Sequence, residues 1–590
     1  MRLKYGWLTE DIGEHNMFKP LRLLAHVFST VAFIMPAAAD AEGSYLWERI
    51  QRNETNTYAR VIELQHAGVL NGRLLATWEH HYTRGPQSND PDGTPGSFII
   101  RQNDDQGATW ETLATVSDTQ TTDGHPFSVF YQPYIFEYPQ QLGKYPQGTL
   151  LLVGNLLPAN CSEFSTEFFA WRSADHGKTW DSLGVWQRGT SQGGIWEPFV
   201  YLDDQGRLMA IFSDERDHQK HSQMLVHGTS EDGGDTWGKP TGDVVSPNKL
   251  ERPGMATVAK MDNGEYIMSY EVCHNYCRIH VKTSPDGSTW DAADLGTVVA
   301  TADGLYPGQS PYTIWDESTK QLVVASQAVR YRLDNSTAEE QYRVVFTNHA
   351  YGVGNWSWSP SPWTVGADAP SCANYSPHLL PVGHGMVRYT APSAEGTTQF
   401  CSERTGAAPI AVLPYNADFS ENREAGWINF GGNWTVIHRE YEFQPLIKDA
   451  VTVAGSSGWN DYVVSANIMI SGTSGTAGLK ARVSASTTGP YKLKGYMATI
   501  NAASGELAVW KYNDRTTLLH SKGHSGGIRA NQWYHLSLSV NSTRLTATLN
   551  QSHGDSHTSL SVTDPSFQEG MVGLFGTGGS GRFKDVEVAA

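Results

Sequence analysis

Two glutamates are the residues of this sequence best suited to do chemistry. Glu197 lies in the run Trp196-Glu-Pro-Phe199, and Glu271 follows Tyr270 at the end of a strand-like run. Burial among aromatic side chains disfavours the charged form of a carboxyl group, so such a glutamate can act as a general acid at neutral pH. Two carboxyl groups at strand ends suggest glycoside hydrolysis. The alternative for a lone glutamate is a strand-edge residue paired with an arginine.

A short turn motif recurs along the first two thirds of the chain. Each copy combines Asp, Gly and Thr-Trp, and the tryptophans are Trp110, Trp180, Trp237 and Trp290, with a weaker fifth copy ending at Trp356. The Asp caps backbone N–H groups and the Gly makes a tight turn, so each copy is expected to join two antiparallel strands. Repeats roughly sixty residues apart predict the blades of a β-propeller, which brings distant residues to one mouth.

The N-terminus is expected to be an export signal. Lys19 and Arg22 precede the apolar run 23–35, and small residues follow at 37–41. Residues 1–41 are therefore predicted to be a signal peptide with an upstream extension, and the protein to be secreted and extracellular. Seven glycosylation sequons fit this prediction, namely Asn53, Asn160, Asn335, Asn355, Asn433, Asn541 and Asn550.

The five cysteines are too few for a disulfide scaffold but allow two bridges. Cys273 and Cys277 are close enough to close a loop beside Glu271, and Cys372 could pair with Cys401. A zinc site is the alternative for Cys273 and Cys277, but secretion favours the disulfide. Neither a metal nor another cofactor is expected.

Composition limits the classes of partner. The net charge is −18 and no basic cluster stands out, so neither nucleic acid nor an anionic membrane surface is expected to bind. Aromatic residues make up 11% of the chain, which suits both sugar contact and β-sheet packing. We expect a monomer.

The segments between the turn motifs carry a resemblance to one family. In order they are Tyr58-Ala-Arg60, Trp78-Glu79, Tyr131-Gln-Pro-Tyr134, Trp196-Glu-Pro-Phe199, Ser213-Asp214-Glu-Arg216-Asp217, Arg252-Pro-Gly-Met255, Tyr270-Glu271 and Ser310-Pro-Tyr312. Together with the Asp-box turns of sialidases and related glycosidases, they resemble the fungal exo-α-1,5-L-arabinanases of glycoside hydrolase family 93. The resemblance covers roughly residues 47–412.

This resemblance implies a six-bladed propeller that releases arabinobiose from the non-reducing end of linear arabinan with retained configuration. The expected substrate is thus a plant cell-wall polysaccharide, either arabinan or the side chains of pectin. Glu197 and Glu271 would be catalytic. The apolar setting of Glu197 suits the acid/base, and arginines near Glu271 suit an ionised nucleophile. Nine further residues are expected to bind substrate or to orient the glutamates: Arg60, Glu79, Tyr134, Trp196, Asp214, Arg216, Arg252, Tyr270 and Tyr312.

The sequence departs from the family pattern at two places. The insert from Cys273 to Cys277 lies beside the site, and Tyr375-Ser-Pro-His378 stands where family members often have Tyr-Ser-Arg. Two alternative functions stay open. One is a sialidase-like hydrolase, which would use three arginines such as Arg60, Arg216 and Arg252 on a carboxylate. The other is a non-catalytic propeller lectin, against which the joint presence of both glutamates argues.

The repeats stop near Leu413, and the pattern changes to short period-2 runs with Gly/Ser turns. Residues 413–590 are therefore predicted to form a separate β-sandwich of the jelly-roll type, after a propeller at 42–412. This order resembles the concanavalin-like modules that bind carbohydrate on secreted glycosidases. A purely structural domain is the alternative, because a fold alone does not fix function.

Overall fold

The structure is a computed structural model. It describes residues 43–48, 54–82, 96–117, 127–158, 165–396, 400–419, 424–444, 449–485, 493–513, 515–552 and 556–590. The predicted export signal, Cys161 and the sequons at Asn53 and Asn160 lie outside these residues. Within them the fold is all-β, as predicted, and the one helical element is the 3-10 turn η1 (Gly68–Leu70). No helix among these residues has the length and apolar character to cross a bilayer.

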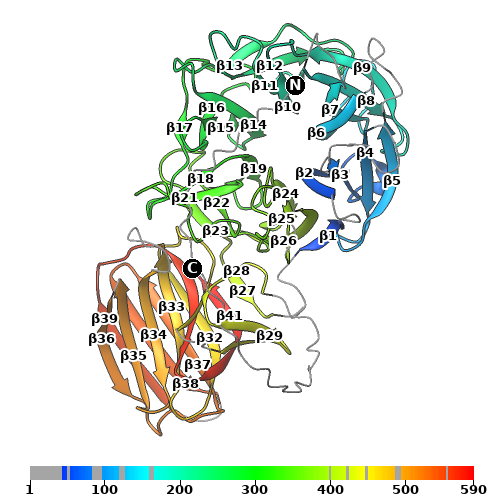
Figure 1. Cartoon of the computed structure of the whole chain (residues 1–590). Coiled ribbons are helices and arrows are strands. Elements are labelled where there is room, and N and C mark those ends of the chain that lie inside the picture. Colours follow the sequence, from blue (N-terminus) through cyan, green and yellow to red (C-terminus); the bar gives the residue numbers. More distant parts are fainter. Residues whose placement is uncertain are drawn as a thin grey trace, which may run out of the picture. The chain divides into compact units, whose positions relative to one another are not determined.

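Six sheets formed by the described residues between 44 and 409 are the blades of a β-propeller, and Figure 1 shows them arranged in a ring. Blade 1 contains β2 (Glu54–Glu63), β3 (Leu74–Tyr82), β4 (Ser97–Asn103) and β5 (Glu111–Ser117). Blade 2 contains β6 (Phe127–Glu137), β7 (Leu150–Pro158), β8 (Glu167–Ser173) and β9 (Asp181–Arg188). Blade 3 contains β10 (Ile195–Leu202), β11 (Leu208–Asp214), β12 (Met224–Ser230) and β13 (Thr241–Val244).

The remaining blades depart slightly from this pattern. Blade 4 contains β14 (Arg252–Lys260), β15 (Tyr266–Cys273), β16 (Arg278–Ser284), β17 (Thr297–Val298), β18 (Leu305–Gly308) and β21 (Ala328–Tyr331). Blade 5 contains β19 (Tyr312–Asp316), β20 (Gln321–Ala325), β22 (Val344–Asn348) and β23 (Ser357–Pro360). Blade 6 contains β24 (His378–Gly383), β25 (Met386–Ser393), β26 (Ser402–Pro409) and, from the other end of the chain, β1 (Ser44–Trp47).

Two features close the ring. Each innermost strand contacts the innermost strand of the next blade, in the order β2, β6, β10, β14, β19, β24 and back to β2. In addition, β1 pairs antiparallel with β26, so the N-terminal strand completes the last blade. Radial repetition of this kind leaves each blade with only short, protected edges.

The blades are held together by apolar side chains on both of their faces. In β8 every side chain is buried, and Phe168 and Phe169 point to opposite sides of the strand. Phe169 packs in a cluster with residues of blade 1, whereas Phe168 packs with Phe212 of blade 3. A strand covered on both faces reads as a continuous apolar run, which explains the composition of these strands.

The recurring turn motif joins antiparallel strands, as predicted. It connects β4 to β5, β8 to β9 and β12 to β13. In the second copy the Asp175 carboxylate accepts hydrogen bonds from the backbone N–H (2.9 Å) and hydroxyl (2.7 Å) of Thr179. Ser173 Oγ accepts the Gly177 N–H at 2.8 Å. The carboxylates of these Asp side chains accept hydrogen bonds within the turns, so their role is structural.

The C-terminal residues form two further antiparallel sheets. One contains β27 (Tyr415–Ala417), β29 (Asn433–Ile437), β30 (Glu440–Gln444), β32 (Tyr462–Ser471), β37 (Trp533–Asn541), β38 (Arg544–Gln551), β39 (His557–Thr563) and β41 (Ser580–Ala589). The other contains β28 (Trp427–Gly431), β31 (Ala450–Ala454), β33 (Thr476–Ser484), β34 (Lys494–Asn501), β35 (Glu506–Asn513), β36 (Arg515–Gly523) and β40 (Met571–Thr577). One apolar cluster contains residues of both sheets, which is consistent with a sandwich.

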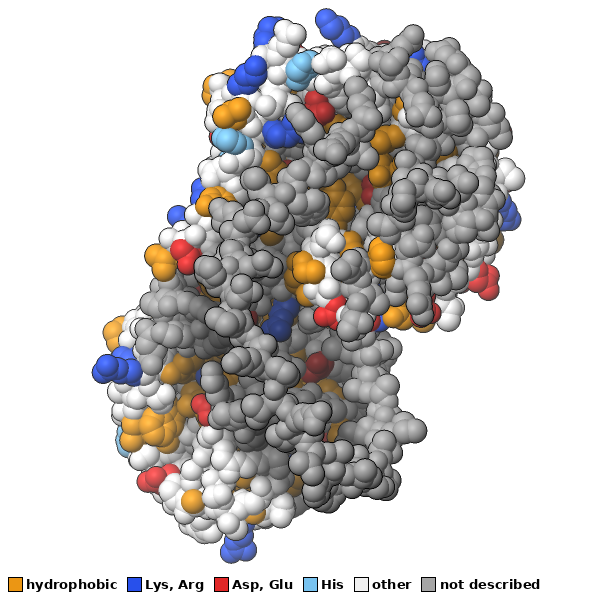
Figure 2. Space-filling view, viewed as in Figure 1, with side chains coloured by type: hydrophobic (Ala, Val, Ile, Leu, Met, Phe, Trp, Pro, Cys, Tyr) orange, Lys and Arg blue, Asp and Glu red, His pale blue; other side chains and the backbone are white. Residues whose placement is uncertain are grey.

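On the part of the surface that is visible in Figure 2, charged side chains are dispersed. On the face shown in Figure 2, the Lys and Arg side chains of the described residues stand singly, with Asp and Glu between them. A protein that binds nucleic acid through its phosphates needs a basic patch or stripe. The visible part of this face offers none.

Candidate active site

One backbone irregularity recurs in the innermost segment of every blade and places the site. Six residues that are not glycine have positive φ there: Tyr58 (61°), Gln132 (53°), Glu197 (56°), Met255 (54°), Ser310 (48°) and Ser376 (53°). In blades 1 to 4 each lies in a β-bulge, where the register to the second strand shifts. In blades 5 and 6 the residue lies two positions before Tyr312 and His378, which begin β19 and β24.

This repeated bulge has an energetic cost. The left-handed conformation costs a residue that is not glycine on the order of 1–3 kcal/mol, and such strain clusters at functional sites. A bulge also turns a side chain away from the regular alternation of its strand. Glu197 is therefore one of six equivalent positions around the central axis, and it is the acidic one.

Glu197 is 9% exposed and is gripped by the equivalent residue of the preceding blade. The Gln132 amide donates from Nε2 to Oε1 of Glu197 at 3.2 Å and accepts the Glu197 backbone N–H at 2.8 Å. Among the described residues, Oε2 of Glu197 has no partner in hydrogen-bond geometry. Burial raises the pKa of Glu197 to about 8, the Ser213 hydroxyl counteracts the rise, and the charge of Glu271 adds to it.

Glu271 lies on β15, the second strand of the adjacent blade, opposite Gly254 of β14. Its Oε2 accepts the Ser310 backbone N–H at 2.9 Å, and Sγ of Cys273 lies 3.4 Å from its Oε1. Burial raises the pKa of Glu271 to about 7, against the Ser310 hydrogen bond and the positive charge of Arg252, which both lower it. A donated N–H and a nearby guanidinium favour the ionised carboxylate.

The two glutamates form an electrostatically coupled pair. The charge of Glu271 raises the pKa of Glu197, and Arg252 lowers the pKa of both. Because their pKa values are about 8 and about 7, one carboxyl group is protonated and the other ionised between about pH 7 and pH 8. The environments favour the proton on Glu197. This is the state that an acid and a nucleophile require.

Arg252 is the predicted binding residue that lies best for both glutamates. Its guanidinium is held by the carboxylate of Glu215, the side-chain oxygen of Gln223 and, at 3.1 Å, the carbonyl of Ser222. The side chain remains 41% exposed, so it faces solvent while its charge acts on the pair. Glu215 in turn accepts the Gly194 N–H just before β10, which ties this cluster to the strand of Glu197.

Arg60, Tyr134 and Tyr312 lie two residues after the bulge positions of blades 1, 2 and 5, and they pack against one another. The hydroxyls of Tyr134 and Tyr312 are hydrogen-bonded, and the Arg60 guanidinium lies 5.1 Å from the Tyr312 ring centroid. Arg60 also donates to the carbonyl (3.1 Å) and hydroxyl (2.8 Å) of Ser376. The three side chains thus pack together beside the bulges, and the Arg60 guanidinium is fixed by contacts within the protein.

The structure gives four other predicted site residues structural contacts. Asp214 and Arg216 pair with each other in a bidentate arrangement, with distances of 2.9 and 2.6 Å. Glu79 accepts the Gln132 N–H at 2.8 Å and the Thr57 hydroxyl at 2.9 Å, which links blades 1 and 2. The fully buried Tyr270 donates to the Leu295 carbonyl at 2.6 Å, so its hydroxyl is bound within the protein. Trp196 precedes Glu197 on β10 and is partly exposed.

Both predicted disulfides are present. Cys273–Cys277 closes the loop after Glu271, and Cys372–Cys401 closes the longer one. Sulfurs bonded to each other cannot serve as thiolate ligands, so the zinc alternative for Cys273 and Cys277 is wrong. The Cys277 carbonyl accepts the Gln309 N–H at 2.9 Å, next to the residue that binds Glu271. The loop therefore supports the surroundings of that glutamate.

Sequence reasoning missed the residues that orient the glutamates, above all Gln132. A signal was present. Tyr131-Gln-Pro-Tyr134 and Trp196-Glu-Pro-Phe199 share the form aromatic, amide or acid, proline, aromatic. Alignment of these runs as equivalent innermost strands would have placed Gln132 at the position of Glu197. Ser213 and Glu215 lie in the segment Ser213-Asp214-Glu-Arg216-Asp217 that carries the resemblance but were not chosen, whereas Gln223 had no comparable signal.

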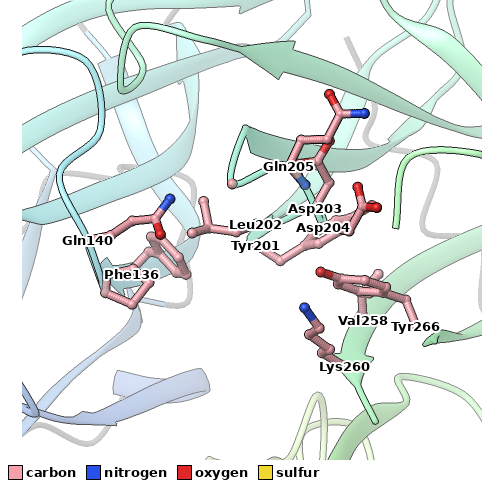
Figure 3. A pocket seen from close by; sticks show the side chains of 12 residues that line it. Phe136, Gln140, Tyr201, Leu202, Asp203, Asp204, Gln205, Val258, Lys260 and Tyr266 are labelled. Atoms are coloured by element: carbon pink, nitrogen blue, oxygen red, sulfur yellow. Dashed lines mark hydrogen bonds between the residues drawn. The ribbon is translucent and has the colours of Figure 1, made fainter. Parts of the chain in front are cut away.

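A cavity lies at the opposite end of the inner strands. Its volume is about 470 Å³, and residues of β6, β10, β14 and β15 line it, among them Phe136, Tyr201, Lys260 and Tyr266. Figure 3 shows the Tyr266 and Lys260 side chains together at one side of it. Leu202 of the lining ends β10, whereas Glu197 lies near the beginning of that strand. The cavity is therefore not part of the glutamate site.

Known proteins resemble both parts of the chain. A GH93 α-L-arabinofuranosidase of Fusarium graminearum, solved with arabinobiose, has 26% identity over 62% of this chain and 97% of its own, with a TM-score of 0.51. A Penicillium chrysogenum α-L-arabinanase, also solved with arabinobiose, has 26% identity over 63% and 98%, with a TM-score of 0.50. Residues 433–578 match the family described as galactocerebrosidase, C-terminal lectin domain. No curated protein sequence matches the chain significantly. The chain is thus similar to glycoside hydrolases over 62% of its length and to a lectin domain near its C-terminus.

Proposed function

We propose that the protein is a secreted, retaining exo-glycosidase that releases arabinobiose from the non-reducing end of α-1,5-L-arabinan. The observation that carries the proposal is the coupled pair of Glu197 and Glu271, with pKa values of about 8 and about 7, on adjacent blades. The similarity to two proteins solved with arabinobiose supports the choice of substrate. Export, glycosylation and a monomeric state belong to the proposal, as do arabinan or pectin side chains as the natural partner.

In the proposed mechanism each residue has one role. The Glu271 carboxylate attacks the anomeric carbon and forms a bond to it, while the C–O bond to the departing arabinan breaks. The Glu197 carboxyl gives its proton to the departing oxygen. Glu197, now ionised, then takes a proton from water, whose oxygen displaces Glu271 and frees arabinobiose. The hydrogen bond from the Ser310 N–H and the charge of Arg252 both lower the pKa of Glu271 against the effect of burial, and so favour its ionised form.

The arrangement of the arginines disfavours a sialidase. A sialidase-like enzyme would need three guanidiniums directed at one carboxylate substrate. Here Arg60 is bound to Ser376, Arg216 to Asp214 and Arg252 to Glu215.

We propose for residues 413–590 a carbohydrate-binding role, supported by the match to a lectin domain.

Digestion of linear arabinan tests the proposal. The protein is expected to release arabinobiose as the first and main product, which chromatography of early time points would show. A ladder of longer fragments would contradict exo-action. Release of sialic acid from a sialoside, or sugar binding without turnover of either substrate, would favour the sialidase-like or the lectin alternative.

A further inference from the structure

The structure assigns a positioning role to Gln132: its amide holds Oε1 of Glu197, so that Oε2 is the atom that carries the transferable proton. This inference rests on the proposed function and adds a residue that acts through Glu197. Gln132 is 3% exposed, lies at the equivalent bulge of the preceding blade, and contacts Glu197 by both side chain and backbone.

Backbone groups fix the orientation of the Gln132 amide. A backbone N–H can only donate, so the atom that receives the Glu197 N–H at 2.8 Å must be the oxygen of Gln132. The same oxygen receives Nδ2 of Asn155 at 3.0 Å. The nitrogen of Gln132 therefore faces Oε1 of Glu197, at 3.2 Å.

Asn155 is fixed in the same way. Its Nδ2 also donates to the Ile195 carbonyl at 3.0 Å, and a carbonyl can only accept. The amide of Asn155 thus cannot turn over without two lost hydrogen bonds. The Gln132 backbone is held as well, because its N–H donates to Oε1 of Glu79 at 2.8 Å. A series of hydrogen bonds therefore runs from the Ile195 carbonyl through the side chains of Asn155 and Gln132 to Glu197, and it orients the acid.

This series of hydrogen bonds distinguishes the two oxygens of Glu197. Oε1 accepts an N–H bond, which suits the carbonyl oxygen of a protonated carboxyl group. No described donor meets Oε2 in strict hydrogen-bond geometry. The Ser213 hydroxyl also interacts with this carboxyl group and lowers its pKa, but a carboxyl group can accept several hydrogen bonds. A proton on Oε2 would give that atom a partner when the leaving oxygen of a glycoside arrives. Gln132 therefore does not supply the proton but determines where it is.

The test compares substrates that differ in their need for a proton. The shortened arabinan chain is a poor leaving group because its oxygen needs a proton, whereas the aryloxide of an activated aryl arabinobioside departs almost without protonation. In Gln132→Met, kcat/KM on arabinan is expected to fall by about 10- to 100-fold, since general acid catalysis contributes roughly 10²- to 10⁴-fold and depends on geometry. On the aryl substrate the fall in kcat/KM, which reports the first step alone, is expected to stay below about 3-fold, because that step needs no acid.

Two further variants separate positioning from folding. Asn155→Ala removes a donor to Gln132, and Asn155 itself makes no hydrogen bond to Glu197. We again expect a greater loss of activity on arabinan than on the aryl substrate, but a smaller one than in Gln132→Met. Gln321→Leu is the matched control. Gln321 is also buried and donates to the Ile410 carbonyl at 2.9 Å, and it lies opposite the last residue of β19, away from the bulge that precedes this strand. It should affect both substrates equally. Equal losses on both substrates in Gln132→Met and Asn155→Ala would overturn the inference, as would no loss in either.

An infrared titration separates this inference from the proposed function. The carboxyl band of Glu197, taken as the difference between wild type and Glu197→Gln, needs no substrate. Loss of a donor to the carboxylate destabilises the ionised form, so the midpoint should move to higher pH in Gln132→Met. An unmoved midpoint would overturn the inference. If wild type failed on both arabinose substrates while the midpoint moved, the proposed function alone would be wrong.

Discussion

Replacement of Glu271 by alanine is expected to lower kcat on arabinan by roughly 10⁴-fold or more, because the variant lacks the nucleophile and cannot form the glycosyl-enzyme. On an activated aryl arabinobioside, added azide fits into the space left by the carboxylate. Azide would then attack directly and give a glycosyl azide of inverted configuration. The measurement is the anomeric configuration of that product by NMR.

The matched control is Glu265→Ala, an exposed glutamate just before the same strand, whose carboxylate accepts from Asn263 at 2.8 Å. This variant should keep wild-type activity on both substrates. A glycosyl azide of retained configuration from Glu271→Ala would exchange the roles of the two glutamates. Near-wild-type activity of Glu271→Ala on arabinan would remove Glu271 from the site.

Replacement of Glu197 by alanine is expected to lower kcat on arabinan by about 10²- to 10⁴-fold, the usual contribution of general acid catalysis. The first step on the activated aryl substrate should remain fast, since that leaving group needs no proton. The glycosyl-enzyme should then accumulate, and azide should release it as a glycosyl azide of retained configuration. An inverted azide product from this variant would contradict the assignment.

The same variant has a signature in the pH profile. Wild type needs Glu197 protonated and Glu271 ionised. The value of kcat/KM should therefore fall above about pH 8, where Glu197 loses its proton, and below about pH 7, where Glu271 gains one. In Glu197→Ala, assayed on the aryl substrate, the alkaline limb should disappear while the acidic limb remains. An alkaline limb that persists would show that another group controls it.

The sequence was sufficient for the elements whose physics is local. The Asp turns depend on side-chain contacts within a few residues, such as Asp175 with Thr179, and the structure has the predicted connections between strands. The two glutamates were visible because their aromatic and apolar neighbours are adjacent in sequence. Cys273 and Cys277 were also close enough for their pairing to be predicted.

The sequence was insufficient where the partner of a side chain depends on the folded geometry. Tyr270 precedes Glu271, yet alternation along β15 directs its hydroxyl to the Leu295 carbonyl. Asp214 and Arg216 were predicted as substrate contacts, and the structure adds that they pair with each other. The pairing of β1 with β26 joins residues more than 350 positions apart, and a strand as short as Ser44–Trp47 has no pattern that would reveal its partner.

If Glu197 and Glu271 act as acid/base and nucleophile of a retaining enzyme, the configuration of the first anomer formed must show it. Arabinan is mixed with wild-type protein, and the anomeric signals of arabinobiose are followed by ¹H NMR before mutarotation equilibrates them. Two displacements at the same carbon return the original configuration, so the α-anomer should appear first. Initial formation of the β-anomer would show a single displacement by water and would contradict this assignment.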